Sequence, residues 1–196
     1  CIDCEAGRYV ETEGSTTASD CVECAAGSIT NTGSSAGATA CTACAVGKYS
    51  TASNVGACIA CPKGKYAASD GLATCAECAA GEYQASDGQG YCKVCVAGSI
   101  ANTGAGVQAK ACTACAAGKY STASNVNACI GCPAGRYVQT TGSDEATDCA
   151  RCPEGSITNT GISVGASSCT ACSAGKYSTA SNIDTCTVCT AGKYAD

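Results

Sequence analysis

The chain has 196 residues, of which 22 are cysteine and 24 glycine, with no tryptophan, phenylalanine, methionine or histidine and a net charge of −5. Leucine, isoleucine and valine together number only 20. So few large apolar side chains cannot bury enough surface to offset the entropy that is lost when the chain is ordered. This excludes a conventional globular core, and the cysteine content predicts a small scaffold stabilised by disulfides.

The composition also limits where the protein works and what it binds. Paired cysteines in this number are expected as disulfides outside the cell or at its surface, because a cytosol would keep them reduced. The sequence has no basic patch for nucleic acid and no apolar run long enough to span a membrane. Because the chain starts at a cysteine and ends shortly after its last cysteine pair, we expect a processed chain or a piece of a longer array.

A nine-residue motif organises the whole sequence. It consists of Cys, two residues, Cys, two residues, Gly, one residue, and then Tyr or Ile, and it contains all 22 cysteines. Self-similarity at such a short period is typical of linear arrays in which each repeat contacts its neighbours. We therefore expect residues 1–196 to form one continuous array. Its repeats begin at Cys1, Cys21, Cys41, Cys58, Cys75, Cys92, Cys112, Cys129, Cys149, Cys169 and Cys186.

Each repeat has the composition of a small β-hairpin. The residues after the motif glycine, such as 48–51, favour extended structure, and a residue that tolerates positive φ follows them. These turn residues are Gly14, Gly33, Gly71, Gly88, Gly104, Gly142, Gly161, Asn54, Asn125 and Asn182. Glycine also interrupts every alanine-rich run, which disfavours helices. The expected fold is therefore a small disulfide-rich β protein, a linear solenoid-like array of about eleven short β-hairpin units with little or no helix.

The tyrosine or isoleucine that ends the motif is the largest side chain in most repeats. Since it recurs in one slot, we expect it to cover the disulfide and the neighbouring repeat; a ladder of ligand-binding tyrosines is the alternative. The motif glycine is expected to allow a sharp turn beside the cysteine pair.

The disulfide connectivity is predicted from the equivalence of the pairs. If the second cysteine of each pair joins the first cysteine of the next pair, every pair is treated alike. This rule predicts Cys4–Cys21, Cys24–Cys41, Cys44–Cys58, Cys61–Cys75, Cys78–Cys92, Cys95–Cys112, Cys115–Cys129, Cys132–Cys149, Cys152–Cys169 and Cys172–Cys186. Cys1 and Cys189 are left for neighbours outside the sequence. The competing rule joins first to first and second to second across two pairs, which leaves one of eleven pairs unmatched.

Other chemistries fit the motif less well. Two cysteine pairs at this spacing resemble a four-thiolate zinc site, but eleven pairs do not divide into such sites without a remainder. A thioredoxin-like redox pair needs a helix that this glycine-rich context does not supply. Hydrolytic catalysis lacks histidine, and Asp70, Asp87, Asp144 and Asp148 lack the clustering of a calcium loop. We therefore expect no enzyme, no cofactor and no metal, and we interpret the carboxylates and the basic residues beside tyrosine as scattered surface charge.

The motif resembles the cysteine-rich repeats of ephrin-receptor-like and tumour-necrosis-factor-receptor-like ectodomains. The closest matches are residues 61–66, with the sequence CPKGKY, and residues 132–137, with the sequence CPAGRY. Long arrays of this kind are similar to those in large surface proteins of protists and algae. The resemblance covers the whole chain and implies an extracellular architecture without an enzymatic centre.

These observations predict an extracellular structural protein that forms a rod, a surface coat or a filament, with self-association as its main interaction. The alternative is a ligand-binding or adhesion segment of a cell-surface receptor ectodomain, for which Tyr91, the one tyrosine outside the motif, is the only extra aromatic side chain. Serine and threonine are abundant on the expected turns, so O-linked glycans are also expected. The candidate threonines are Thr30, Thr32, Thr51, Thr122, Thr158, Thr160 and Thr179.

Overall fold

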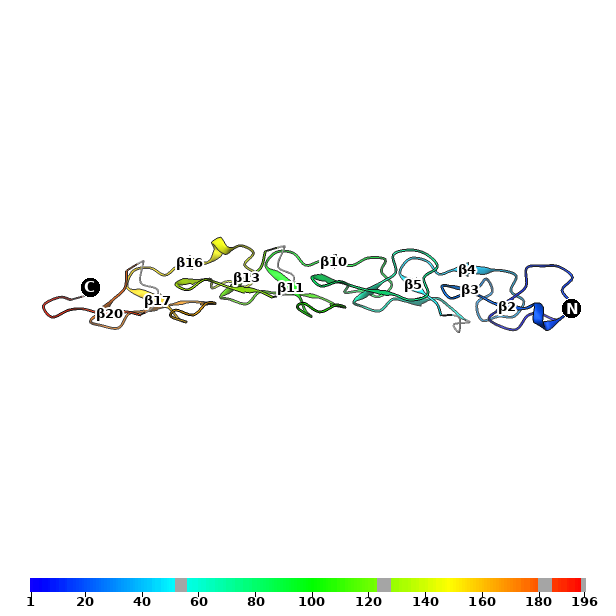
Figure 1. Cartoon of the computed structure of the whole chain (residues 1–196), viewed down its shortest axis with the longest axis horizontal. Helices are drawn as coiled ribbons and strands as arrows, with labels where there is room; N and C mark the ends of the chain where they lie inside the picture. The colour runs from blue at the N-terminus through cyan, green and yellow to red at the C-terminus, as the bar shows by residue number, and fades with distance from the viewer. Residues whose placement is uncertain (52–55, 123–127, 180–184, 195–196) are drawn as a thin grey trace. The chain divides into compact units, whose positions relative to one another are not determined.

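A computed structural model of the chain describes residues 1–51, 56–122, 128–179 and 185–194 (Figure 1). Three of the predicted turn residues, Asn54, Asn125 and Asn182, lie outside these ranges. The chain divides into two compact parts, the first made of residues 1–94 and 107–111 and the second of residues 95–106 and 112–196. Each part consists of two-stranded antiparallel hairpins, so the predicted fold class is confirmed.

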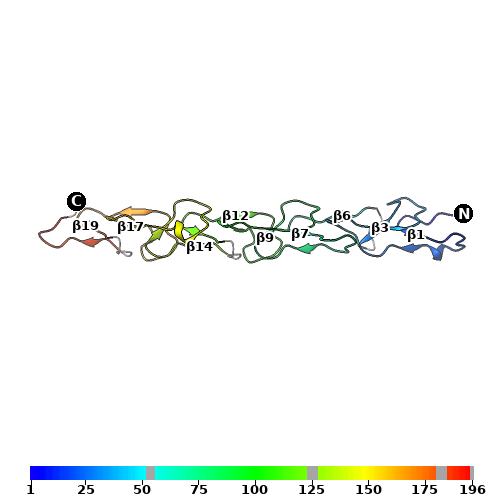
Figure 2. The same cartoon turned by 90° about the horizontal axis from the view of Figure 1, so that it is seen from above.

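The hairpins of the first part follow one another in chain order (Figures 1 and 2). The paired strands are β1 (Arg8–Tyr9) with β2 (Val22–Glu23), β3 (Ser28–Thr30) with β4 (Cys41–Ala43), β5 (Lys48–Tyr49) with β6 (Ile59–Ala60), β7 (Lys65–Tyr66) with β8 (Ala76–Glu77), and β9 (Glu82–Tyr83) with β10 (Lys93–Val94).

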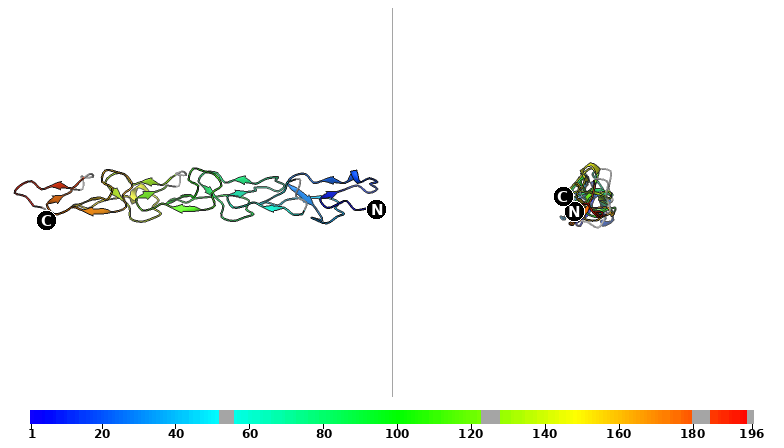
Figure 3. Two further views of the ribbon diagram at one scale, coloured as in Figure 1. Left: turned by 90° about the horizontal axis from the view of Figure 1, so that it is seen from below. Right: turned by 90° about the vertical axis from the view of Figure 1, so that its left-hand side faces the viewer.

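The second part repeats the same arrangement, which the left view of Figure 3 also shows. Its paired strands are β11 (Ser99–Ala101) with β12 (Cys112–Ala114), β13 (Lys119–Tyr120) with β14 (Ile130–Gly131), β15 (Arg136–Tyr137) with β16 (Ala150–Arg151), β17 (Ser156–Thr158) with β18 (Cys169–Ala171), and β19 (Lys176–Tyr177) with β20 (Thr187–Val188).

Each hairpin joins two repeats, which differs from the prediction that a hairpin lies within one repeat. The strand after the motif glycine pairs with the residues between the two cysteines of the next repeat, as Ile29 pairs with Thr42. The sequence suggested extended structure only after the glycine, because the two residues inside a cysteine pair are too short a segment to show a period. Since the return strand carries the cysteines, each hairpin places a cysteine pair beside the preceding repeat.

The described helical segments are two single turns of 3-10 helix, η1 (Ala18–Asp20) and η2 (Ala146–Asp148), at equivalent places in two repeats. In both, the aspartate at the third position accepts hydrogen bonds from backbone N–H groups just before the turn, at 3.1 Å from Thr16 to Asp20 and 3.0 Å from Asp144 to Asp148. These contacts satisfy donors that a single turn leaves without a backbone partner.

The buried interior consists of cystines and small side chains. The second cysteine of most repeats is buried, as is the residue that follows the motif tyrosine or isoleucine, such as Ser50, Ala67 or Ser121. Most of the tyrosines and isoleucines themselves are half-buried. Tyr120 packs against the buried cluster of Cys132, Val138 and Cys149. In that cluster the motif tyrosine covers the disulfide of the next repeat, as the sequence led us to expect.

The predicted turn glycines that the structure describes all have positive φ, from 59° at Gly161 to 80° at Gly14. In the three repeats that contain the sequence Gly-Ser-Ile, a second residue with positive φ lies four positions after the turn glycine. This second residue was not predicted from the sequence. This residue is Gly37 or Gly165 in two of these repeats, but Gln108 with φ 64° in the third. An L side chain in this region costs roughly 1–2 kcal/mol. The Nε2 of Gln108 donates a hydrogen bond to the Oε1 of Glu77, which offsets part of that cost.

We predict that Gln108→Gly is more stable than Gln108→Ala by about 1 kcal/mol, because both variants lose the hydrogen bond to Glu77 and only glycine relieves the left-handed backbone. Denaturant unfolding of the two variants measures this difference directly. Equal stabilities would show that the backbone at residue 108 is not held in the left-handed region.

Candidate functional site: the junction between repeats

The junction between successive repeats is the feature that recurs most often in the structure. In each of ten junctions a disulfide joins the second cysteine of one repeat to the first cysteine of the next, with Cα–Cα distances of 5.6 to 5.8 Å. The pairs are Cys4–Cys21, Cys24–Cys41, Cys44–Cys58, Cys61–Cys75, Cys78–Cys92, Cys95–Cys112, Cys115–Cys129, Cys132–Cys149, Cys152–Cys169 and Cys172–Cys186. Cys1 and Cys189 are not in disulfides.

At several junctions, backbone hydrogen bonds of the motif glycine accompany the disulfide. In the first part, the Gly27 N–H donates to the Ser50 carbonyl at 2.7 Å, and the Gly27 carbonyl accepts from the Cys44 N–H at 2.8 Å. The Cys44 carbonyl in turn accepts from the N–H of Gly71, the turn glycine of the following repeat, at 2.8 Å. Gly27 is thus hydrogen-bonded to the next repeat. Cys44 of that next repeat is in turn hydrogen-bonded to the repeat after it.

The second part repeats this pattern with nearly the same distances. The Gly118 N–H donates to the Val138 carbonyl at 2.7 Å, and its carbonyl accepts from the Cys132 N–H at 2.8 Å. The Cys132 carbonyl accepts from the Gly165 N–H at 2.8 Å. Because the same bonds recur in both parts, they belong to the repeat and do not depend on one local sequence.

In several repeats the motif glycine also contacts the backbone of a repeat two positions further along, and this contact leaves no room for a side chain. A Cβ atom on Gly27 would lie 1.9 Å from the Gly71 carbonyl oxygen, on Gly47 2.0 Å from that of Gly88, and on Gly118 2.2 Å from that of Gly165. All three glycines also have positive φ, from 82° to 92°. Glycine is therefore required both by the backbone conformation and by the close approach of another backbone.

The sequence predicts the turn at the motif glycine but not its contact two repeats away. One feature of the sequence could have indicated this contact. Glycine occupies this motif position in all eleven repeats, and asparagine, which also tolerates positive φ, never replaces it. The buried slot after the motif tyrosine or isoleucine was also missed. The burial of this position could have been recognised from the sequence, because the position holds a small or β-branched residue in every repeat except at Gln84.

Several carboxylates bond to the backbone at these junctions, which corrects their interpretation as scattered surface charge. Asp70 Oδ1 accepts a hydrogen bond from the Val46 N–H at 2.8 Å, and Asp87 Oδ1 accepts one from the Lys63 N–H at 2.9 Å. Hydrogen bonds from the backbone and side chain of Thr17 hold the pKa of the Asp20 carboxyl below its usual value. These aspartates stabilise loops of the array and do not converge on a shared site.

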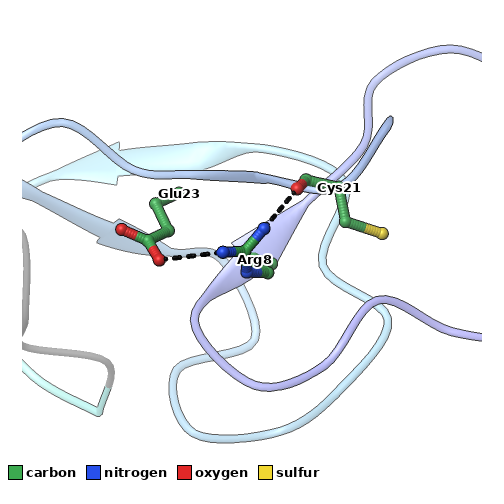
Figure 4. A network of polar contacts seen from close by, with 3 residues as sticks. All are labelled: Arg8, Cys21 and Glu23. Carbon is green, nitrogen blue, oxygen red and sulfur yellow. Dashed lines mark hydrogen bonds and ion pairs between the residues drawn. The ribbon is translucent and has the colours of Figure 1, made fainter. Parts of the chain in front are cut away.

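Two arginines beside motif tyrosines are also held by the framework. Arg8 donates through Nη1 to the Cys21 carbonyl at 2.9 Å and through Nη2 to Glu23 at 3.1 Å, as Figure 4 shows. Arg136 makes the equivalent bond to the Cys149 carbonyl at 2.7 Å. The prediction that Arg136 is simply a solvated strand charge is therefore wrong. The carbonyl of a disulfide-bonded cysteine fixes one edge of each guanidinium.

The candidate glycosylation residues divide into two groups in the structure. Thr30 and Thr158 are each only 2% exposed, and their hydroxyls donate to the carbonyls of Gly33 and Gly161 at 2.7 and 2.8 Å. The expectation of sugar at these two threonines is therefore corrected, because a buried, hydrogen-bonded hydroxyl is not accessible in the folded chain. The candidates that remain are Thr32, Thr51, Thr122, Thr160 and Thr179, which are exposed or half-buried.

Metal binding has little support from the donor atoms that are present. Sulfur atoms joined in disulfides are not the thiolates that zinc requires. Across the described ranges, no group of three or more cysteine, aspartate, glutamate or histidine side chains is arranged to hold a metal ion. Within the same ranges, no helix has the length and apolar character needed to cross a membrane.

Comparison with known proteins identifies the family. The family described as tyrosine-protein kinase ephrin type A/B receptor-like matches residues 32–71, 64–105 and 103–149, which together cover more than half of the chain. The chain therefore belongs to the ephrin-receptor-like family of cysteine-rich repeats. A search of curated proteins finds no match. The family and the ten disulfides indicate an extracellular disulfide-rich module, and the family is not an enzyme class.

We predict that Gly118→Ala destabilises the protein more than Gly155→Ala. Gly155 is a matched control because it has φ 79° and the same two kinds of backbone hydrogen bond, to Ser178 and Cys172, but no described atom within 4 Å of a Cβ position. Gly155→Ala should cost roughly 1–2 kcal/mol for the left-handed backbone alone. Gly118→Ala should cost about 1–3 kcal/mol more, because the new methyl group overlaps the Gly165 carbonyl.

Thermal or denaturant unfolding of both oxidised variants measures the difference. If the two substitutions destabilised the chain equally, the close approach of Gly118 to Gly165 would not contribute to stability in solution.

Proposed function

We propose that the protein is an extracellular structural array, which forms a rod, a surface coat or a filament through its disulfide-linked repeats. The observation that carries this proposal is the uniformity of the junction. The same disulfide, glycine hydrogen bonds and close backbone approach recur in repeat after repeat, in both parts of the chain. A framework in which the same contacts recur in many repeats favours a role that depends on repetition over one that depends on a single site.

The chemistry of the exposed surface also supports a structural role. Exposed large apolar side chains, such as Val22, Ile59 and Ile130, lie on return strands of separate hairpins. The expected lateral partners are further copies of the array, because short two-stranded hairpins present strand edges to neighbours. Where a repeat array associates through contacts that do not close on themselves, the product is a filament or a layer. O-linked glycans on the remaining threonine candidates, such as Thr32 and Thr160, would then coat its surface.

A ligand-binding or adhesion segment of a receptor ectodomain is the second candidate function, and Tyr91 is the observation that favours it. Its side chain is 58% exposed, and its carbonyl accepts a hydrogen bond at 2.6 Å from Gln84, which is 2% exposed. At the preceding residue, Gly90, a Cβ atom would lie 2.3 Å from a methyl group of Val46. The backbone that carries this exposed aromatic ring thus makes close contacts within the array, and tyrosine is enriched at binding interfaces.

Electron microscopy of native material separates the two functions. We predict fibres or layers with a regular axial or lateral repeat, in which the array of this chain is identified by an antibody against it. Isolated, irregular chains that carry the array as a spacer to another domain would contradict the structural assembly. Loss of cell adhesion after Tyr91→Ala, with assembly unchanged, would support the receptor segment instead.

A further inference from the structure

Three return strands, β4, β12 and β18, carry a threonine at the same place in the motif. Thr42, Thr113 and Thr170 each follow the first cysteine of a repeat, in the sequence Cys-Thr-Ala-Cys. Each pairs in register with the motif isoleucine of the preceding repeat, as Thr42 does with Ile29. The same local structure therefore presents one hydroxyl in three repeats; Figures 1 and 2 label two of these strands, β4 and β12.

Side chains at this place in the motif are open to solvent. All three threonines are exposed, and other repeats hold exposed apolar residues at the same place, with Ile59 43% and Ile130 42% exposed. The adjacent in-register pair of the first hairpin, Thr30 with Cys41, lies on the opposite face, and Thr30 is buried. One hairpin thus has a threonine on each face, and only the strand threonine is accessible from outside.

The hydroxyls of the three strand threonines have no hydrogen-bond partner among the described residues. By contrast, the loop threonine of each of these hairpins donates its hydroxyl hydrogen to a carbonyl. These bonds run from Thr32 to Ser35, from Thr103 to Gly106 and from Thr160 to Ser163, at 2.8 to 2.9 Å. A substituent on the oxygen replaces the hydroxyl hydrogen, so it breaks such a bond in the loops and breaks none on the strands.

Small side chains flank each strand threonine. Ala43 and Ala45 follow Thr42, and Ala114 and Ala116 follow Thr113; all four alanines are exposed. An enzyme that modifies the threonine Oγ1 must bring the reacting atom of its donor to within about 3–3.5 Å of this oxygen. Flanking side chains no larger than a methyl group leave room for that approach.

We propose that Thr42, Thr113 and Thr170 are O-glycosylation sites that accept a sugar from a sugar-nucleotide donor. The bond between Oγ1 and the anomeric carbon forms as the bond from that carbon to the nucleotide diphosphate breaks, and the hydroxyl proton passes to a base of the transferase. This inference rests on the extracellular location in the proposed function, and its acceptors were not predicted from the sequence. Sugar on these strands would shield them, and lateral contacts would then form at repeats that hold Ile59 or Ile130 at this place.

Glycopeptide mapping of the natural protein by mass spectrometry, with fragmentation that leaves each sugar on its side chain, tests the inference. We expect sugar on Thr42, Thr113 and Thr170, and none on Thr30 and Thr158, which are buried. Absence of sugar from all three strand threonines would overturn the inference. Equal occupancy of Thr30 and Thr158 would overturn it as well, because the folded array would then not select the acceptors.

Variants of the full chain, secreted from a eukaryotic host, provide a second test. Thr42→Ala combined with Thr113→Ala and Thr170→Ala should lose the strand sugar and still oxidise fully, because the exposed hydroxyls have no described partner to lose. The same three changes to serine should retain the sugar, since serine keeps the hydroxyl. The matched control is Thr32→Ala with Thr103→Ala and Thr160→Ala, which should also retain it. Loss of the strand sugar from this control, or an unchanged sugar content in the first variant, would contradict the proposal.

Electron microscopy of the native material gives a separate result. Regular fibres together with unmodified strand threonines would leave the proposed structural function intact and reject only these glycosylation sites. Isolated, irregular chains that carry sugar at Thr42, Thr113 and Thr170 would reject the structural assembly and support the sites.

Discussion

The disulfide from each repeat to the next is the constraint on which the rest of the structure depends. The chain has few large apolar side chains, and its buried interior consists of cystines and small residues. Each crosslink closes a loop with a sequence separation of 14 or 17 residues, which stabilises the folded state by about 3 kcal/mol on the chain-entropy model. Successive disulfides restrict the unfolded chain all along its length, and this replaces the core that no single repeat could build.

Contacts between backbone atoms are the second interaction that holds the repeats together. With few side chains to interdigitate, neighbouring repeats are joined by main-chain hydrogen bonds, as between Gly27 and Ser50. Repeats two positions apart are in contact through direct approach of one backbone to another, as between Gly27 and Gly71. This explains why turns and strands are short and why the side chains of the cysteine-pair strands, such as Thr42 and Ile59, are free to vary in chemistry. The chemistry of the surface can therefore differ between repeats, as it does between Glu23 and Arg151, while the framework stays the same.

The sequence was sufficient to predict the class of fold, because the cysteine spacing and the turn glycines are local signals. Gly14 and Gly71 have the positive φ that was predicted from their place in the repeat. The partner of each strand could not be predicted. The return strand lies at the two residues between the cysteines of a pair, and so short a segment shows no alternation of apolar and polar side chains. The burial of Thr30 and Thr158 was also missed, since a threonine on a surface turn and one that caps a buried turn have the same local sequence.

Non-reducing peptide mapping of the natural protein by mass spectrometry tests the central claim most directly. The account predicts crosslinked peptides that join the second cysteine of each pair to the first cysteine of the next, beginning with Cys4–Cys21 and Cys24–Cys41. Peptides that join Cys1 to Cys21 together with Cys4 to Cys24 would contradict it, because the return strands would then be held in a different register. Free thiols that become unreactive when zinc is added would contradict it as well.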